Sequence, residues 1–115
     1  MESGKAVVYG ILFDFDKDTI KEAESKPVLD EVVAALQKHP DWRFRVEGHT
    51  DDKGDDAYNL ELSARRAAAV VAWLGAAGVD AGRFESQGNG ESSPVADNKE
   101  PAGRALNQRV EMHRL

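Results

Sequence analysis

The sequence contains no cysteine in its 115 residues. This absence excludes disulfides, thiolate metal sites and a cysteine nucleophile, and it leaves the redox compartment undetermined. There is also no run of about 18 apolar residues, so the sequence predicts no membrane-spanning helix. The first four residues lack a positive region followed by a hydrophobic stretch, so we expect no signal peptide there. The chain is therefore either cytoplasmic or one domain of a longer exported protein.

Positive charge is also scarce, with 15 lysines and arginines against 21 aspartates and glutamates and a net charge of −6. Nucleic acid is a polyanion whose affinity for proteins comes largely from basic contacts, so we expect no nucleic-acid partner. Hydrophobic residues make up 41% of the chain, which is enough for one core without covalent links. At this length the sequence predicts a single domain over residues 1–115, with residues 1–6 as a linker.

Strand and helix patterns alternate along the chain, which predicts an α/β fold with helices packed on a sheet. Alternating or β-branched stretches predict four strands, and helical spacing predicts two longer helices and a short helical turn. The expected strands cover residues 6–13, 43–47, 83–87 and 109–113, and the helical segments cover 27–36, 60–76 and 103–106. The first two strands should be parallel, because a helix connects them.

Polar residues mark the expected ends of the helices. Asn59 is placed to cap the first turn of the long helix, and Gly78 fits its far end. Thr19 and Glu22 have the spacing of a capping box, which allows the first helix to begin before residue 27.

Arg66 stands out because it lies within an apolar stripe of the long helix. At about 100° per residue, it falls between Leu62 and Val70 on the helical wheel. Such a stripe normally faces the core, and an arginine there needs a carboxylate or several acceptors. Two interpretations stay open: a structural ion pair, or an arginine available to an external ligand.

The expected loops around Arg66 favour the second interpretation. Ligands of open α/β sheets gather beyond the carboxyl ends of the strands. Asp14 and Phe15 follow the first strand and Asp51 follows the second, so parallel strands would open both loops where the long helix begins. A carboxylate and an arginine together suit a ligand head that carries an ammonium and a carboxylate. Free backbone amide groups at the start of the helix would donate hydrogen bonds to the carboxylate of the ligand.

Several ordered blocks of the sequence resemble the signature of the OmpA-like C-terminal domain. In chain order the blocks are 13–16, 48–51, 58–59, 62–67, 78–79, 88–91, 94–98 and 103–111. The resemblance extends from about residue 8 to the end of the chain. It implies a mixed sheet of about four strands in β-α-β-α-β-(α)-β order, with helices packed on it. It also implies a domain of the envelope of diderm bacteria that holds peptidoglycan non-covalently.

In such domains the ligand is the diaminopimelate of the peptidoglycan stem peptide. The resemblance assigns the key aspartate to Asp51 and the key arginine to Arg66. The other residues that match ligand-binding positions of the family are Thr50, Asn59, Arg109, Phe13 and Asp14. The chain would then be a non-catalytic cell-wall anchor without cofactor or metal, in the periplasm, as the soluble domain of an outer-membrane protein or lipoprotein. Attachment to the membrane would need segments absent from this chain, and dimerisation stays open.

One residue departs from the family pattern. The family usually has Asn-Arg-Arg-Val near its end, and here Gln108 replaces the first arginine. Neighbouring residues of a strand point to opposite faces, so Gln108 should face away from the pocket if Arg109 faces it. In the opposite register, one positive contact of the site is lost.

Three alternatives are weaker. His49 beside Asp51 suggests acid–base or metal chemistry, but no H-E-x-x-H, G-x-S-x-G or phosphate-binding loop accompanies them. The aspartates at positions 14, 16 and 18 alternate as in a calcium-binding loop, yet Thr19 and Ser25 stand where glycine and glutamate belong. Trp42, at an expected surface turn, is the candidate anchor for a protein partner.

Overall fold

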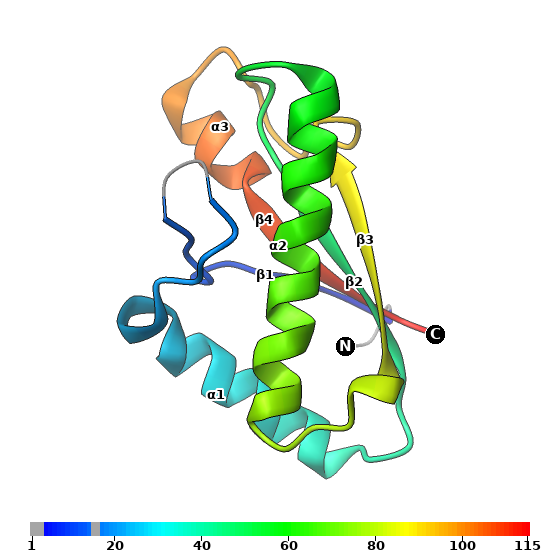
Figure 1. Cartoon of the computed structure of the whole chain (residues 1–115). Helices are drawn as coiled ribbons and strands as arrows, with labels where there is room; N and C mark the ends of the chain where they lie inside the picture. The colour runs from blue at the N-terminus through cyan, green and yellow to red at the C-terminus, as the bar shows by residue number, and fades with distance from the viewer. Residues whose placement is uncertain (1–3, 15–16) are drawn as a thin grey trace.

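The computed structural model describes residues 4–14 and 17–115. The described chain forms a four-stranded sheet whose one face is covered by two helices, α1 and α2 (Figure 1). In chain order the elements are β1 (Lys5–Val8), α1 (Glu22–Lys38), β2 (Phe44–His49), α2 (Asp56–Ala76), the 3-10 turn η1 (Ala81–Arg83), β3 (Phe84–Gly90), α3 (Pro101–Asn107) and β4 (Arg109–Arg114). The predicted α/β class and the order of its elements are confirmed.

The sheet is mixed, with strand order β1-β4-β2-β3. Strand β2 pairs in parallel with β3, whereas β4 is antiparallel to both β1 and β2. The first two strands therefore run in the same direction, as expected. They are not neighbours, however, because the last strand of the chain lies between them.

The N-terminal segment differs from the prediction at both of its ends. Lys5 and Ala6, which were expected in a linker, pair with β4 and begin β1. The strand stops at Val8 rather than near residue 13, and Gly10 then has a positive φ of 94°, which favours glycine. Beyond this turn, Phe13 forms an isolated bridge with Ile20. Phe15 and Asp16, part of the resemblance, lie outside the described residues.

Both long helices begin earlier than the apolar spacing indicates. Helix α1 starts at Glu22, before residue 27, but its N-cap is Lys21 and no side-chain hydrogen bond caps it, so Thr19 and Glu22 do not form the expected capping box. Helix α2 starts at Asp56 and is capped by Asp55, whose carboxylate accepts a hydrogen bond from the Ala57 amide at 3.0 Å. The prediction that Asn59 caps this helix is therefore wrong, since Asn59 lies within the first turn.

Helix α2 packs closely on the two central parallel strands. Gly48 of β2 faces the Ser63 carbonyl, and Gly88 of β3 faces the backbone of Ala64. A Cβ atom at either glycine would overlap these helix atoms, so the two glycines permit the close approach. The contact fixes the height of the helix above the carboxyl end of β2, where the pocket described below opens.

Candidate functional site

A pocket of about 640 Å³ opens between α2 and the segments that follow β1 and β2. The predicted site residues that line it are Phe13, Thr50, Asp51, Asn59, Arg66 and Arg109. Asp14 is not among the lining residues, although its carbonyl lies near the guanidinium of Arg66. The two loops that were expected to open at one edge of the sheet therefore do converge there.

Asp51 is the acidic residue that lines this pocket, and it is only 7% exposed. Its Oδ1 accepts a hydrogen bond from the Lys53 amide at 2.9 Å, and its Oδ2 accepts one from the side-chain amide of Gln108. Both donors are neutral groups. Each carboxylate oxygen retains capacity to accept another hydrogen bond.

Thr50 and Asn59 hold the backbone around Asp51 in place. The Thr50 hydroxyl donates to the Asp51 carbonyl at 2.8 Å, and the Thr50 amide donates to the Gly90 carbonyl on β3. The side-chain amide of Asn59 donates to the Lys53 carbonyl at 2.8 Å. Both side chains are buried, so their hydrogen bonds fix the loop firmly. Their role in the described structure is to position Asp51.

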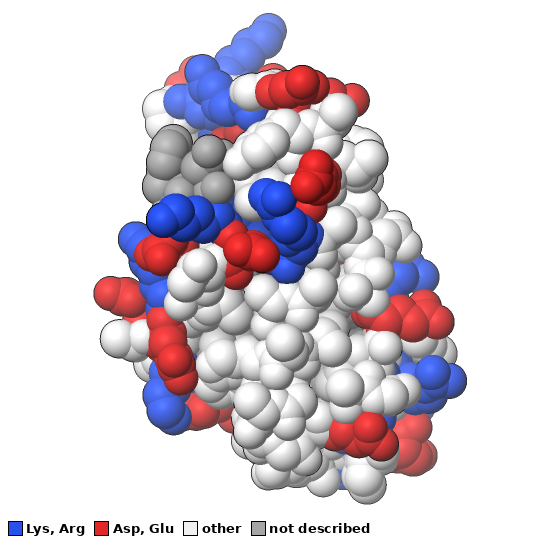
Figure 2. Space-filling model, in the orientation of Figure 1, with Lys and Arg blue, Asp and Glu red and all other residues white. Residues whose placement is uncertain are grey.

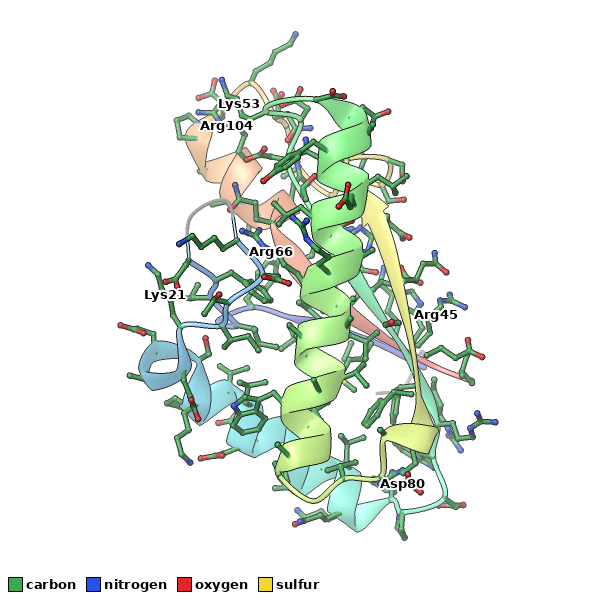
Figure 3. The ribbon with its side chains drawn as sticks, in the orientation of Figure 1. Lys21, Arg45, Lys53, Arg66, Asp80 and Arg104 are labelled. Atoms are coloured by element: carbon green, nitrogen blue, oxygen red, sulfur yellow. The ribbon has the colours of Figure 1, made fainter. Side chains whose placement is uncertain are left out.

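Arg66 projects from the third turn of α2 toward the segment before α1 (Figure 3). Its Nε donates to the Lys17 carbonyl at 2.9 Å, and its guanidinium carbon lies 4.9 Å from the centre of the Phe13 ring. The side chain is half-buried, so the expectation that it sits in the middle of a buried stripe is wrong. The buried stripe instead runs through Ala67, Val70 and Leu74, and Arg66 lies at its edge. An arginine at the pocket margin can meet a ligand without a large desolvation cost.

Arg109 lines the pocket but is committed to the protein itself. Its Nε donates to the Glu111 carboxylate at 2.6 Å, and its remaining nitrogens donate to the carbonyls of Asn107 and Ser93. Burial raises the pKa of Glu111, but hydrogen bonds from His113 and Arg109 outweigh burial and lower it to about 2. The described contacts therefore support a structural role for Arg109.

His49 belongs to the same buried network on the sheet face away from the helices. Its Nε2 lies 3.2 Å from the Glu47 carboxylate, and its Nδ1 has no hydrogen-bond partner within residues 4–14 and 17–115. Burial and the charge of Arg109 lower the pKa of His49, which favours the neutral ring. The ligand atoms of Glu47, His49 and Glu111 lie within 4.8 Å of one another, a spacing that a metal ion can bridge.

Arginines already neutralise the two carboxylates of this cluster. Arg45 Nε lies 2.7 Å from Glu47, and Arg109 lies 2.6 Å from Glu111. Burial raises the pKa of Glu47, but the hydrogen bond from Arg45 and the charge of His113 give it a net lowering. A buried ion-pair network explains these contacts fully, and the two carboxylates hold the sheet face together.

Sequence reasoning missed three pocket residues that carry polar groups at its rim. Gln108 bonds Asp51, and Lys21 and Lys53 line the pocket from opposite walls. The sequence left two registers open for Gln108, and its bond to Asp51 agrees with the register in which Gln108 contacts the site. The lysines carry no pattern of their own in the sequence. Only their positions, one before α1 and one two residues after Asp51, indicate that they lie near the expected ligand.

Together the mixed sheet and the packing of α2 define an α/β domain with a polar pocket at one end of its sheet. A family model described as the OmpA family matches residues 12–108. The chain therefore belongs to the OmpA family, and the resemblance seen in the sequence is confirmed.

Relatives in sequence include outer-membrane proteins that are longer than this chain. Outer membrane porin F of Pseudomonas aeruginosa is 47% identical over 102 residues, covering 88% of this chain and 29% of that protein. Outer membrane protein A of Bordetella avium is 43% identical over 100 residues, covering 87% of this chain and 51% of that protein. This chain thus spans only about a third to a half of the length of these two relatives.

Relatives in structure include cell-wall-associated proteins. The peptidoglycan-associated lipoprotein of Burkholderia pseudomallei superposes with a TM-score of 0.80 and 30% identity, covering 91% of this chain and 88% of that one. The cell wall anchor of the T6SS from Pseudomonas aeruginosa gives a TM-score of 0.79 and 32% identity, covering 96% and 87%. Both likenesses extend over nearly the whole domain.

Proposed function

We propose that this domain anchors a cell-envelope protein to the cell wall by binding the peptidoglycan stem peptide non-covalently. The diaminopimelate residue of that peptide has a free end with an ammonium and a carboxylate. The single observation that carries the proposal is that Asp51 and Arg66 line one open pocket. In the complex, Asp51 accepts hydrogen bonds from the ammonium, and Arg66 pairs with the neighbouring carboxylate.

The supporting contacts explain why the aspartate is ready to bind. Thr50 and Asn59 fix the Asp51 backbone, so little ordering is needed when the ligand arrives. The Lys53 backbone amide and the Gln108 side-chain amide that donate to Asp51 are neutral groups, which supports a role of its carboxylate in accepting hydrogen bonds from the ligand ammonium. Each charge-assisted hydrogen bond contributes about 1.5–3 kcal/mol net, part of which is lost to desolvation and ordering. A single site therefore binds modestly, and several copies on one polymer retain the protein more strongly.

Anchoring rather than catalysis suits this arrangement. Asp51 serves as an ion partner, and the carboxylates Glu47 and Glu111 are engaged by arginines in the buried network. Within the described residues, no helix combines the length and apolarity needed to cross a bilayer. The relatives include outer-membrane proteins, which supports a location of this domain in the periplasm. Other segments would supply any attachment to the membrane.

Sedimentation with purified sacculi tests the proposal. Asp51→Asn keeps an acceptor for the Lys53 amide and should abolish co-sedimentation while leaving the thermal transition nearly unchanged. Arg66→Ala should abolish it as well. The matched controls are Asp52→Asn and Arg65→Ala, at exposed neighbouring positions, and these should sediment like the unmodified protein. Retention of both site variants on sacculi would reject the site.

The chemistry of the ligand gives a second arm of the test. Peptidoglycan with lysine in place of diaminopimelate keeps the ammonium but lacks the adjacent carboxylate. It should bind more weakly, because the lost carboxylate is the proposed partner of Arg66. Equal binding of both polymers by the unmodified protein would show that Arg66 does not pair with the diaminopimelate carboxylate.

A further inference from the structure

The charge of the pocket is opposite to the charge of the whole chain. The chain has a net charge of −6, yet the described residues that line the pocket include four cationic side chains and one carboxylate, that of Asp51. The cationic residues are Lys21, Lys53, Arg66 and Arg109. A ligand with one ammonium and one carboxylate does not use all of this positive charge.

Two of the four cations have no counter-ion among the residues that the structure describes. Arg109 is matched by Glu111, and Arg66 is assigned to the diaminopimelate head. Among residues 4–14 and 17–115, no ion pair joins the ammonium of Lys21 or Lys53 to a carboxylate. Both lysines are exposed, so their ammonium groups can reach a ligand at the rim of the pocket.

The backbones of these two lysines are fixed on opposite walls. The Lys21 amide donates to the Leu12 carbonyl at 2.8 Å, next to the bridge between Phe13 and Ile20. The Lys53 amide donates to Asp51, and its carbonyl accepts from Asn59. Figure 3 shows Lys53 at the upper end of this face and Lys21 on the segment to the left of Arg66. The two lysines thus bracket the site of the diaminopimelate head.

Acidic residues also lie near the pocket. Asp52 and Asp55 belong to the loop that carries Lys53, and Asp56 begins α2, but all three are exposed and do not line the pocket. Exposed charges are screened over about 8–10 Å at physiological salt. On the space-filling surface, basic and acidic atoms gather across the middle of this face, whereas the lower part is mostly uncharged (Figure 2).

We propose that Lys21 and Lys53 select an acidic, uncross-linked stem peptide by pairing with carboxylates that it carries beyond the diaminopimelate head. A γ-linked glutamate leaves its α-carboxylate free, and the open end of an uncross-linked stem carries a terminal carboxylate. Amidation or cross-linking removes these charges. This inference rests on the proposed function, because it concerns the same pocket and the same peptide.

Calorimetric titration with two synthetic peptides tests the inference. Both contain the γ-linked glutamate and diaminopimelate, and they differ only in whether the glutamate α-carboxylate and the terminal carboxylate are free or amidated. An exposed ion pair changes affinity by about two- to fivefold, so two pairs give roughly tenfold. The unmodified protein should therefore prefer the free-acid peptide by about tenfold.

The doubly substituted variant Lys21→Gln with Lys53→Gln should lose this preference while binding the amidated peptide as well as the unmodified protein does. The matched control is Lys26→Gln with Lys38→Gln, which removes the same charge from α1 outside the pocket and should keep the preference. Equal affinity of the unmodified protein for the two peptides would overturn the inference. So would a control variant that loses the preference as fully as the pocket variant.

The two proposals fail in different ways. If Asp51→Asn abolishes binding of both peptides but the lysine variant retains the tenfold preference, the proposed function stands and the lysine inference falls. If neither peptide binds the unmodified protein, the proposed function is rejected and the lysine inference with it.

Discussion

The side-chain amide of Gln108 donates a hydrogen bond to Asp51, with a distance of 2.5 Å between Nε2 of Gln108 and Oδ2 of Asp51. Strand alternation left two orientations of Gln108 open, and the structure has the one in which Gln108 contacts the site. Gln108 itself is not on the strand. It is the C-cap of α3, and β4 begins only at Arg109. The connection between these elements therefore directs two consecutive side chains toward the same end of the sheet.

Replacing Gln108 with arginine should weaken binding of diaminopimelate by about two- to fivefold. The new guanidinium would pair with Asp51 in the free protein, and an exposed ion pair of this kind is worth about 0.2–1 kcal/mol. The ligand ammonium would then compete with a cation instead of a neutral amide. Calorimetric titration with free diaminopimelate measures the change.

Gln108→Ala is the matched control, because it removes the amide without adding charge. It should bind diaminopimelate within about twofold of the unmodified protein, since Asp51 keeps its bond to the Lys53 amide. Tighter binding by Gln108→Arg than by Gln108→Ala would contradict the competition.

Much of the fold could be predicted from the periodicity of apolar residues. The four strands, the long helix and the short helix after residue 100 were each found within a few positions. The neighbours of β1 could not be predicted, since β4 inserts between β1 and β2 through contacts between residues about 100 positions apart. The cap of α2 was missed because Asp55 and Asn59 are both good capping residues, and only the backbone shows which one precedes the helix.

The site could be predicted only in part. The convergence of Asp51 and Arg66 at one pocket followed from the resemblance and from the expected parallel direction of the first two strands. The degree of burial of Arg66 did not follow, because the wheel shows an apolar stripe but not which of its edges faces the core, and the buried side runs through Ala67, Val70 and Leu74. Arg109 and Glu111 are two positions apart on a strand and so share one face, but the resemblance assigned Arg109 to the ligand and the ion pair was not expected.

Gly48→Ala should destabilise the fold by about 1–3 kcal/mol, the usual cost of overpacking. A Cβ atom at this position would overlap the Ser63 carbonyl, and a helix backbone cannot yield as a flexible side chain can. Displacement of α2 would also move Arg66 away from Asp51, so binding to sacculi should fall together with stability. Urea denaturation measures the first effect and sedimentation the second.

Gly75→Ala provides the control in the same helix. A Cβ atom there would lie 3.8 Å from the Cβ of Ala81, an ordinary contact. Alanine is favoured over glycine within helices by about 0.5–1 kcal/mol, so this variant should be more stable than the unmodified protein. A loss of stability in Gly75→Ala as large as that in Gly48→Ala would contradict the packing explanation.

Asn107→Ala should destabilise the domain by on the order of 2–4 kcal/mol, because it leaves several partly buried backbone groups without partners. The Asn107 side chain is fully buried, accepts from the amides of Val95 and Ala96, and donates to Ala96 and Asn98. These bonds hold the loop between β3 and α3. Limited proteolysis should show faster cleavage within residues 92–98. Asn98→Ala removes only one of these bonds and should be cleaved more slowly than Asn107→Ala.

Acid should unfold the domain in part through Glu111. Its pKa is lowered from 4.5 to about 2 in the fold, so its ionised form stabilises the folded state above pH 4.5. This contribution, on the order of 3 kcal/mol, is lost as the pH falls from about 4.5 to 2. The lowered pKa of His49 acts in the same direction below pH 6.5, because the unfolded chain takes up that proton more readily. Stability should therefore decrease throughout the acid range.

Urea denaturation of Glu111→Gln between pH 7 and pH 2.5 separates the contribution of Glu111 from the rest. The variant should be less stable than the unmodified protein at pH 7, because Arg109 loses its buried counter-ion. The difference in free energy of unfolding between the two proteins should narrow below pH 4.5. There Glu111 takes up a proton in the unfolded chain but stays ionised in the fold, which lowers the stability of the unmodified protein. Glu31→Gln makes the same change of charge at an exposed position of α1. Its free energy of unfolding should change with pH in the same way as that of the unmodified protein. A gap that stays constant from pH 7 to pH 2.5 would show that Glu111 stabilises the fold by packing and not by its charge.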